Sequence, residues 1–211
     1  MSIHPLKIPS KHESFIISDA LVGLRKATAI RHKRLDKCMP LSKVNPTLGD
    51  YYHHLTLLRI WLQPIEKWQE SFFDGPQGLE APVKINRTKL IDIDLKNIPH
   101  YYDQNLSFSY SSNWSLETKV AYRWGVSYVV EGAQLGGMML YKRLTTLLSG
   151  QSCFYLQGEQ GGPGPRWKHF LQIMGENLQT EVEIEDACRG ACDAFDELLS
   201  LQSSYFTRKI L

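Results

Sequence analysis

Apolar residues recur at helical spacing over most of this 211-residue chain, whereas the alternation of apolar and polar residues typical of a half-buried strand is scarce. The long periodic segments cover residues 14–39, 45–73, 115–150, 165–179 and 181–206. A hydrophobic content of 43% is enough for one sizeable core in a chain of this length. The sequence therefore predicts a single all-α domain built as a helical bundle.

Prolines and polar residues indicate where several of these helices begin or end. Pro40 should stop the first helix, because proline has no amide proton and clashes with the preceding turn. Pro46 lies near the start of the second helix, and Pro64 predicts a kink inside it. Ser115 and Thr118 form a capping pattern for the third, with Glu117 placed in its first turn.

The stretches between the long helices have a different composition. Residues 74–114 favour short helices and loops, and "GQSCFYLQGEQGGPGPRW" (150–167) is predicted to be a glycine- and proline-rich connector. Its "GEQGGPGP" lacks the lysine, the serine and the strand context of a phosphate-binding loop.

Charge and targeting signals exclude some classes of protein. The net charge of +2, from 24 basic and 22 acidic residues, is too small for the strongly positive electrostatic potential that is typical of nucleic-acid-binding proteins. The polar N-terminus "MSIHPLKIPSKHES" has no apolar core of a signal peptide, and no stretch reaches the roughly 20 apolar residues of a membrane span. We therefore expect a cytoplasmic protein with neither nucleic acid nor membrane as partner.

Several residue types that often mark sites are interpreted here as structural. The four cysteines lack CxxC spacing and are expected to be reduced, buried thiols. His53 and His54 are adjacent on a helix and point in different directions, so they are expected at the surface or the core edge and not as a chelate. The five tryptophans, Trp167 among them, are expected to fill the core.

Three glycines interrupt an otherwise strong helix. Gly132, Gly136 and Gly137 each cost roughly 1 kcal/mol relative to alanine at such a position. Gly132 and Gly136 are four residues apart and share a face. Either another helix approaches closely there, or the backbone faces a flat ligand. The residues alone favour neither interpretation over the other.

His32 lies in the middle of the first helix, in "LRKATAIRHKRLDK". Asp36, four residues on, could hydrogen-bond one ring nitrogen, as carboxylates commonly do behind a metal-bound histidine. Arg25 lies on the same face and could meet an acidic group of a ligand, while Ala29 is small enough to admit a planar one. Taken alone, this helix favours a half-buried structural histidine that is salt-bridged to Asp36.

Together, "LRKATAIRHKRLD" and "YVVEGAQLGGMMLYKRL" resemble the haem oxygenase family, most closely its bacterial, biliverdin-forming branch. The resemblance covers about residues 14–205 and leaves 1–13 as an N-terminal extension. It implies a bundle in which haem lies between a proximal N-terminal helix and a kinked, glycine-rich distal helix. It also implies that haem is opened to biliverdin with release of CO and ferrous iron, that dioxygen is the co-substrate, and that a ferredoxin or an NAD(P)H-dependent reductase supplies electrons.

On the proximal side, the resemblance makes His32 the iron ligand and Asp36 the carboxylate behind it. Arg25 matches a basic residue that faces a haem propionate in the family. Ala29 would lie beneath the ring.

On the distal side, the resemblance makes Gly132 and Gly136 the wall that leaves room for dioxygen, with Gly137 beside them. Tyr128, one turn before Gly132, matches a tyrosine that reaches a propionate. Lys168 matches a basic residue at the propionate edge.

One position departs from the animal enzymes, which carry an aspartate after the first distal glycine where this chain has Ala133. Gln134 or a backbone carbonyl could hold the distal water instead. Because of Ala133, an alternative function also fits the sequence: a protein that binds or transports haem without degrading it. Two further alternatives are a member of the wider superfamily that holds non-haem iron through Glu66, Glu131 and His32 or binds a small organic cofactor, and a helical interaction module.

Overall fold

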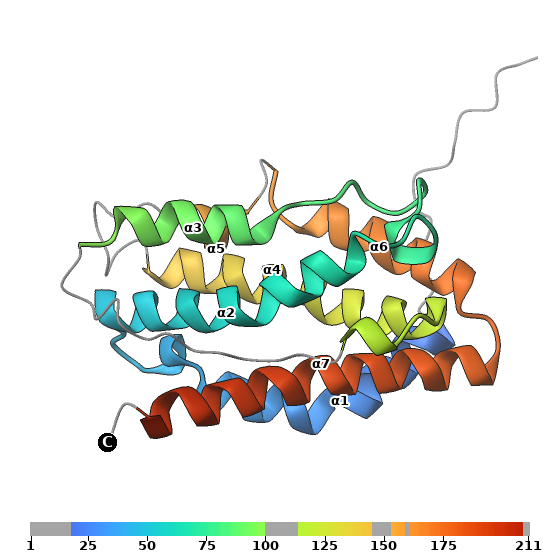
Figure 1. Ribbon diagram of the computed structural model, residues 1–211, viewed down its shortest axis with the longest axis horizontal. Helices are drawn as coiled ribbons and strands as arrows, with labels where there is room; N and C mark the ends of the chain where they lie inside the picture. Colours follow the sequence, from blue (N-terminus) through green and yellow to red (C-terminus); the bar gives the residue numbers. More distant parts are fainter. Residues whose placement is uncertain (1–17, 100–113, 145–152, 159–160, 209–211) are drawn as a thin grey trace, which may run out of the picture.

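A computed structural model describes residues 18–99, 114–144, 153–158 and 161–208 (Figure 1). The described residues form seven α-helices and three short 3₁₀ turns, and none of them lies in a β-strand. The all-α prediction is therefore confirmed. Within the described ranges, no helix combines the length and the apolar content that crossing a bilayer requires.

The elements follow one another in this order: α1 (Asp19–Cys38), η1 (Pro40–Ser42), α2 (Leu48–Gln69), η2 (Gly75–Gln77), α3 (Arg87–Asn97), η3 (Trp114–Leu116), α4 (Val120–Leu144), α5 (Phe154–Gln157), α6 (Gly164–Asn177) and α7 (Glu181–Arg208).

Helix starts are fixed by side chains that satisfy free backbone amides. The Ser18 hydroxyl accepts from the backbone N–H of Leu21 at the start of α1. Thr47 and Asp50 form a reciprocal capping box at the start of α2. α1 ends at Cys38, two residues before Pro40, as predicted.

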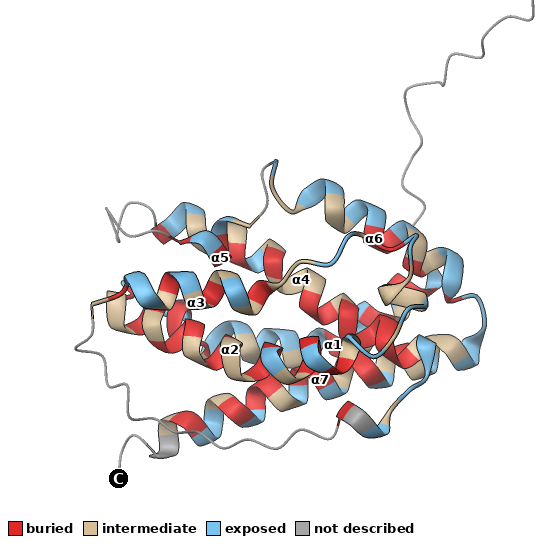
Figure 2. Cartoon of the chain, turned by 45° about the horizontal axis from the view of Figure 1, so that its top comes forward, coloured by how far each residue is buried: buried red, intermediate tan, exposed pale blue. Residues whose placement is uncertain are grey.

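α7 runs along both α1 and α4, and α4 in turn contacts α5 and α6 (Figure 1). α2 packs on α3 and α7. Figure 2 shows the buried positions on the helix faces that look into the bundle. Four of the five tryptophans lie in this core as expected, and Trp167 is only partly buried at its edge.

The contact between α4 and α7 depends on two glycines. A Cβ atom at Gly125 would overlap the backbone carbonyl of Ala187, and one at Gly190 would overlap the carbonyl of Tyr122. No residue with a side chain fits at either position without moving a helix. The two backbones therefore lie in direct contact, a reason for glycine that the sequence analysis did not assign to these positions.

The predicted start of the third long helix is wrong. α4 begins at Val120, and Ser115 lies in η3. Glu117 precedes the helix, where its carboxylate accepts from the backbone N–H groups of Thr118 and Lys119 at 3.1 and 3.2 Å. The same carboxylate binds Arg189 of α7 at 2.8 Å, so a tertiary contact fixes where it lies.

The glycine- and proline-rich connector contains a helix, α5, that the sequence analysis missed. The fully buried carboxylate of Asp94 in α3 accepts from the backbone N–H groups of Phe154 and Tyr155 at 2.9 and 2.8 Å, and from the Tyr51 hydroxyl at 2.9 Å. Gly158, at φ +68°, ends the helix. A residue 60 positions away in the chain thus caps α5.

His53 and His54 are buried, which corrects the expected surface or core-edge placement. Nδ1 of His53 lies 2.9 Å from the Tyr205 hydroxyl of α7. Nδ1 of His54 has no hydrogen-bond partner among the described residues, and burial lowers the pKa of this histidine to about 3. All four cysteines are free, but only Cys153 is buried, and the other three are half-buried.

Candidate functional site: a hollow between α1 and α4

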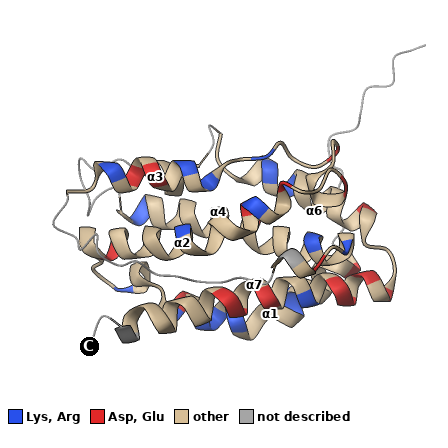
Figure 3. Cartoon of the chain, viewed as in Figure 1, with Lys and Arg blue, Asp and Glu red and all other residues tan. Residues whose placement is uncertain are grey.

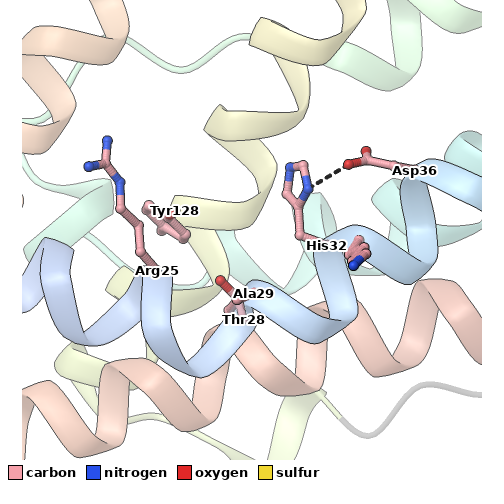
Figure 4. Close-up of a pocket in the computed structure, with 7 residues that line it drawn as sticks. Arg25, Thr28, Ala29, His32, Asp36 and Tyr128 are labelled. Atoms are coloured by element: carbon pink, nitrogen blue, oxygen red, sulfur yellow. Dashed lines mark ion pairs between the residues drawn. The ribbon is translucent and has the colours of Figure 1, made fainter.

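One face of α1 borders a hollow of about 350 Å³ (Figure 4). Its lining residues are Arg25, Thr28, Ala29, His32, Lys33 and Asp36 of α1, and Tyr128 of α4. Residues 25, 29, 32 and 36 of α1 follow one another at intervals of four, three and four, so the helix itself places them on one side. Five predicted site residues are thereby brought together: Arg25, Ala29, His32, Asp36 and Tyr128.

His32 and Asp36 form the predicted contact. Nδ1 of His32 lies 2.8 Å from a carboxylate oxygen of Asp36, and both side chains are 63% exposed. A neutral imidazole that donates from Nδ1 carries its lone pair on Nε2. Figure 4 shows the ring standing away from the α1 backbone.

Phe195 of α7 supports the His32 ring from another helix. The two rings meet edge to face, with centroids 5.9 Å apart. An exposed ion pair contributes on the order of 0–1 kcal/mol to stability, so the His32–Asp36 pair does little for the fold. What the arrangement provides is a ring of fixed orientation with one free nitrogen in an accessible place.

Arg25 and Tyr128 lie at another part of the hollow, where Figure 4 shows the guanidinium group beside the phenol ring. Burial raises the pKa of Tyr128, and the nearby charge and hydrogen bond of Arg25 partly offset that rise. Arg25 is itself exposed, so its cation remains accessible to an acidic group of a ligand. Figure 3 marks the positions of further basic residues along α1.

The three glycines of α4 that the sequence analysis singled out have different surroundings. A Cβ atom at Gly136 would have no heavy atom of the described residues within 4 Å. One at Gly132 would meet only the indole of Trp167, at 3.6 Å. Close helix packing therefore does not explain either glycine.

Gly137 is buried on another side of α4. A Cβ atom there would lie 3.6 Å from the carbonyl oxygen of Leu156 in α5. Lys168 is exposed on α6 and does not line the hollow. The structure thus does not bring Gly137 or Lys168 to the residues around His32.

Glu131 and Glu66, which an alternative reading placed with His32 at a non-haem iron site, have other partners. Glu131 binds Arg166 and Arg87 at 2.7 and 2.9 Å. Burial acts to raise the pKa of Glu131, but the two guanidinium groups bring it below its ordinary value. Glu66 accepts from the backbone N–H of Arg87 at 2.7 Å.

Among the described residues, no three His, Cys, Asp or Glu side chains are placed to hold a metal ion together. Gln134 is buried, and one N–H of its Nε2 donates to the carbonyl of Tyr155 at 2.6 Å. This hydrogen bond holds α5 against α4.

Thr28 and Lys33 line the hollow although the sequence analysis did not select them. Thr28 is buried, and its hydroxyl donates to the carbonyl of Leu24 at 2.7 Å. Helical spacing from Arg25 and Ala29 could have pointed to both residues. Trp167 was interpreted as core, and only the three-dimensional structure shows it beside Gly132.

Comparison with protein-family models gives no match. Among curated proteins, the chain is similar to a protein named heme oxygenase from Xanthomonas campestris pv. campestris (strain 8004), with 37% identity over 75 residues. The alignment covers 34% of this chain and 44% of that relative, so the chain matches less than half of the relative's length. The name of this relative agrees with the predicted resemblance to the haem oxygenase family over that part of the chain, and the all-helical fold agrees with the predicted fold class.

Proposed function

We propose that this protein is a haem-degrading monooxygenase that opens haem to biliverdin and releases CO and ferrous iron. Its co-substrate is dioxygen, and its electrons come from a ferredoxin or an NAD(P)H-dependent reductase. The observation that carries the proposal is the His32–Asp36 pair, which leaves Nε2 of an exposed, oriented imidazole free beside an open hollow. The relative named heme oxygenase supports it.

The residues around the hollow fit a flat, acidic ligand such as haem. The volume of about 350 Å³ lies within the range of about 300–1,000 Å³ that is usual for small-molecule pockets. Ala29 adds little bulk beneath a ring, and Arg25 offers a cation to a propionate. Among the described residues, none has an atom within 4 Å of a Cβ atom at Gly136, which would leave room on the distal side.

Haem, when bound, supplies both the iron that activates dioxygen and the ring that is oxidised. The protein's part is to hold and orient it. Nε2 of His32 would bind the iron, and Asp36 would fix the ring of His32 through Nδ1. Arg25, with Tyr128 beside it, would hold the propionates.

The proposal is tested by titrating the purified protein with haemin and then adding ascorbate in air. A Soret band that saturates at one haem per chain and then decays into a broad bilin absorbance is expected. His32→Ala should abolish this decay while weak haem binding persists, because the hollow still covers the ring.

His169→Ala is the matched control, since His169 is exposed on α6 and does not line the hollow. It should behave like the unmodified protein. A His32→Ala variant with full turnover would rule out His32 as the ligand.

A haem-binding or haem-trafficking protein without turnover is the second candidate. Two observations favour it: Ala133 stands where the animal enzymes have an aspartate, and Gln134 is buried with its Nε2 bonded to the carbonyl of Tyr155. The same titration separates the two functions, because a Soret band that persists after reductant and oxygen are added identifies a carrier.

A further inference from the structure

A side chain from α6 covers part of the glycine-rich face of α4. Cη2 of Trp167 would lie 3.6 Å, and Cζ3 3.9 Å, from a Cβ atom at Gly132, which is ordinary van der Waals contact. One turn further along α4, a Cβ atom at Gly136 would meet no atom of the described part of the chain within 4 Å. The indole therefore borders the open part of this face on one side.

Trp167 belongs to a row of aromatic rings that begins in the core. Its ring is nearly parallel to that of Phe170, at 5.7 Å and 13°, and Phe170 packs on Trp124 at 5.4 Å. Trp124 and Phe170 are buried, so they hold one side of Trp167 in place. Contacts of this kind between rings stabilise a defined orientation.

The row ends at the hollow. The rings of Trp167 and Tyr128 lie 5.4 Å apart, and Tyr128 lines the hollow together with Arg25 and His32. Trp167 is thus connected on one side to the rigid core and on the other to a residue of the candidate site. Its partial burial leaves some of the indole uncovered at this edge.

We propose that Trp167 is a specificity-determining residue of the haem site, which sets how the macrocycle is rotated about its normal. This inference rests on the proposed function. Haem carries its two propionates on one edge, so its rotation in the pocket would decide which meso carbon lies at the position where the ring is opened. Cations at the rim attract the propionate edge, and a bulky wall at Gly132 excludes seatings in which the ring extends toward α6.

The test uses Trp167→Ala and Trp167→Phe in the full-length protein loaded with haemin. Proton NMR of the ferric cyanide complex reports seating without turnover, because each rotation gives its own set of haem methyl resonances. The bilin isomers formed with ascorbate in air are then separated by chromatography.

Trp167→Ala should change the ratio of the methyl sets and, in the same direction, the ratio of isomers. Haem affinity should fall by about tenfold or less, since the bond to His32 remains. Trp167→Phe keeps a ring at the wall and should stay closer to the unmodified protein. It also provides a readout if the alanine variant does not fold.

Trp114→Phe is the control, because the Trp114 ring packs on Trp68 and Tyr122 and Trp114 does not line the hollow. An unchanged ratio of methyl sets in both Trp167 variants would overturn the inference while leaving the proposed function intact. Failure of the unmodified protein to bind haemin would overturn both together.

Discussion

Two regions of α4 use glycine for opposite reasons. Toward α7, Gly125 lies against Ala187, and Gly190 of α7 lies against Tyr122, so that the two backbones touch. Two turns beyond Tyr128 on the same helix, Gly136 has no described atom within 4 Å of the place of its missing Cβ atom. We call the first region closed, because another helix occupies the space beside its glycine, and the second region open, because no described residue does so.

The difference shows what a glycine inside a helix indicates. Each costs roughly 1 kcal/mol of helix stability. At Gly125 the close contact of two helices offsets that cost. At Gly136 no contact within the described protein offsets it, which supports a role for this backbone toward a ligand.

The largest effect is expected at the closed region. Gly125→Ala should lower the free energy of unfolding by about 3 kcal/mol or more, because the added methyl group overlaps the Ala187 carbonyl and forces α4 and α7 apart. Urea denaturation followed by circular dichroism measures this change. An unaltered midpoint would mean that the two helices are not in backbone contact, and the comparison would fail.

The same contrast holds for two histidines. His32 is exposed and paired with Asp36, whereas His54 is buried with an unpartnered Nδ1. Burial lowers the pKa of His54 to about 3, well below the value of about 6.5 expected in the unfolded chain. Between these values the unfolded chain binds a proton that the folded protein does not.

Stability should therefore fall as the pH decreases from about 6.5 toward 3, with a contribution from His54 that approaches 1.4 kcal/mol per pH unit. His54→Gln removes this titration and should flatten the dependence over that range. Urea denaturation at several pH values measures both slopes. His169→Gln, at an exposed position, should leave the slope unchanged, and an equally steep slope in His54→Gln would show that another group causes the acid sensitivity.

A smaller effect, of opposite sign, is expected at the open region. Gly136→Ala should raise the free energy of unfolding by about 0.5–1 kcal/mol, because alanine favours the helix and meets no described neighbour. A loss of stability in this variant would show that another part of the protein packs against Gly136.

Gly136→Leu sharpens the same comparison at the level of function. Its larger side chain should leave the fold intact but fill the distal space, so that CO or oxygen binding to the reduced haem complex decreases. Met139→Leu, at an exposed position of α4, serves as a matched control. Unaltered gas binding in Gly136→Leu would count against a distal role for Gly136.

Local rules were sufficient for much of the fold and for the proximal half of the candidate site. The helical periodicity predicted the long helices, and Pro40 predicted the end of α1. The contact of His32 with Asp36 could be predicted because residues four apart on a helix are neighbours whatever surrounds them. The common face of Arg25, Ala29 and His32 follows from the same geometry.

The errors lie where distant residues compete with local preference. Ser115 carries a capping pattern, but Glu117 is held by Arg189 of α7 and the helix begins later. The glycine-rich connector contains α5 because Asp94, on another helix, satisfies its first amides.

By itself, the sequence determined that the chain is helical, where most of its long helices lie, and that one face of α1 carries a histidine with its carboxylate. These features depend on hydrogen bonds and side-chain contacts within one or two helical turns. Only the tertiary structure decided which glycine packs against another helix and which has no described neighbour. It also decided that His54 is buried and that Trp167 lies beside Gly132. Those properties depend on which helix faces meet, and helix packing brings together residues that are far apart in the chain.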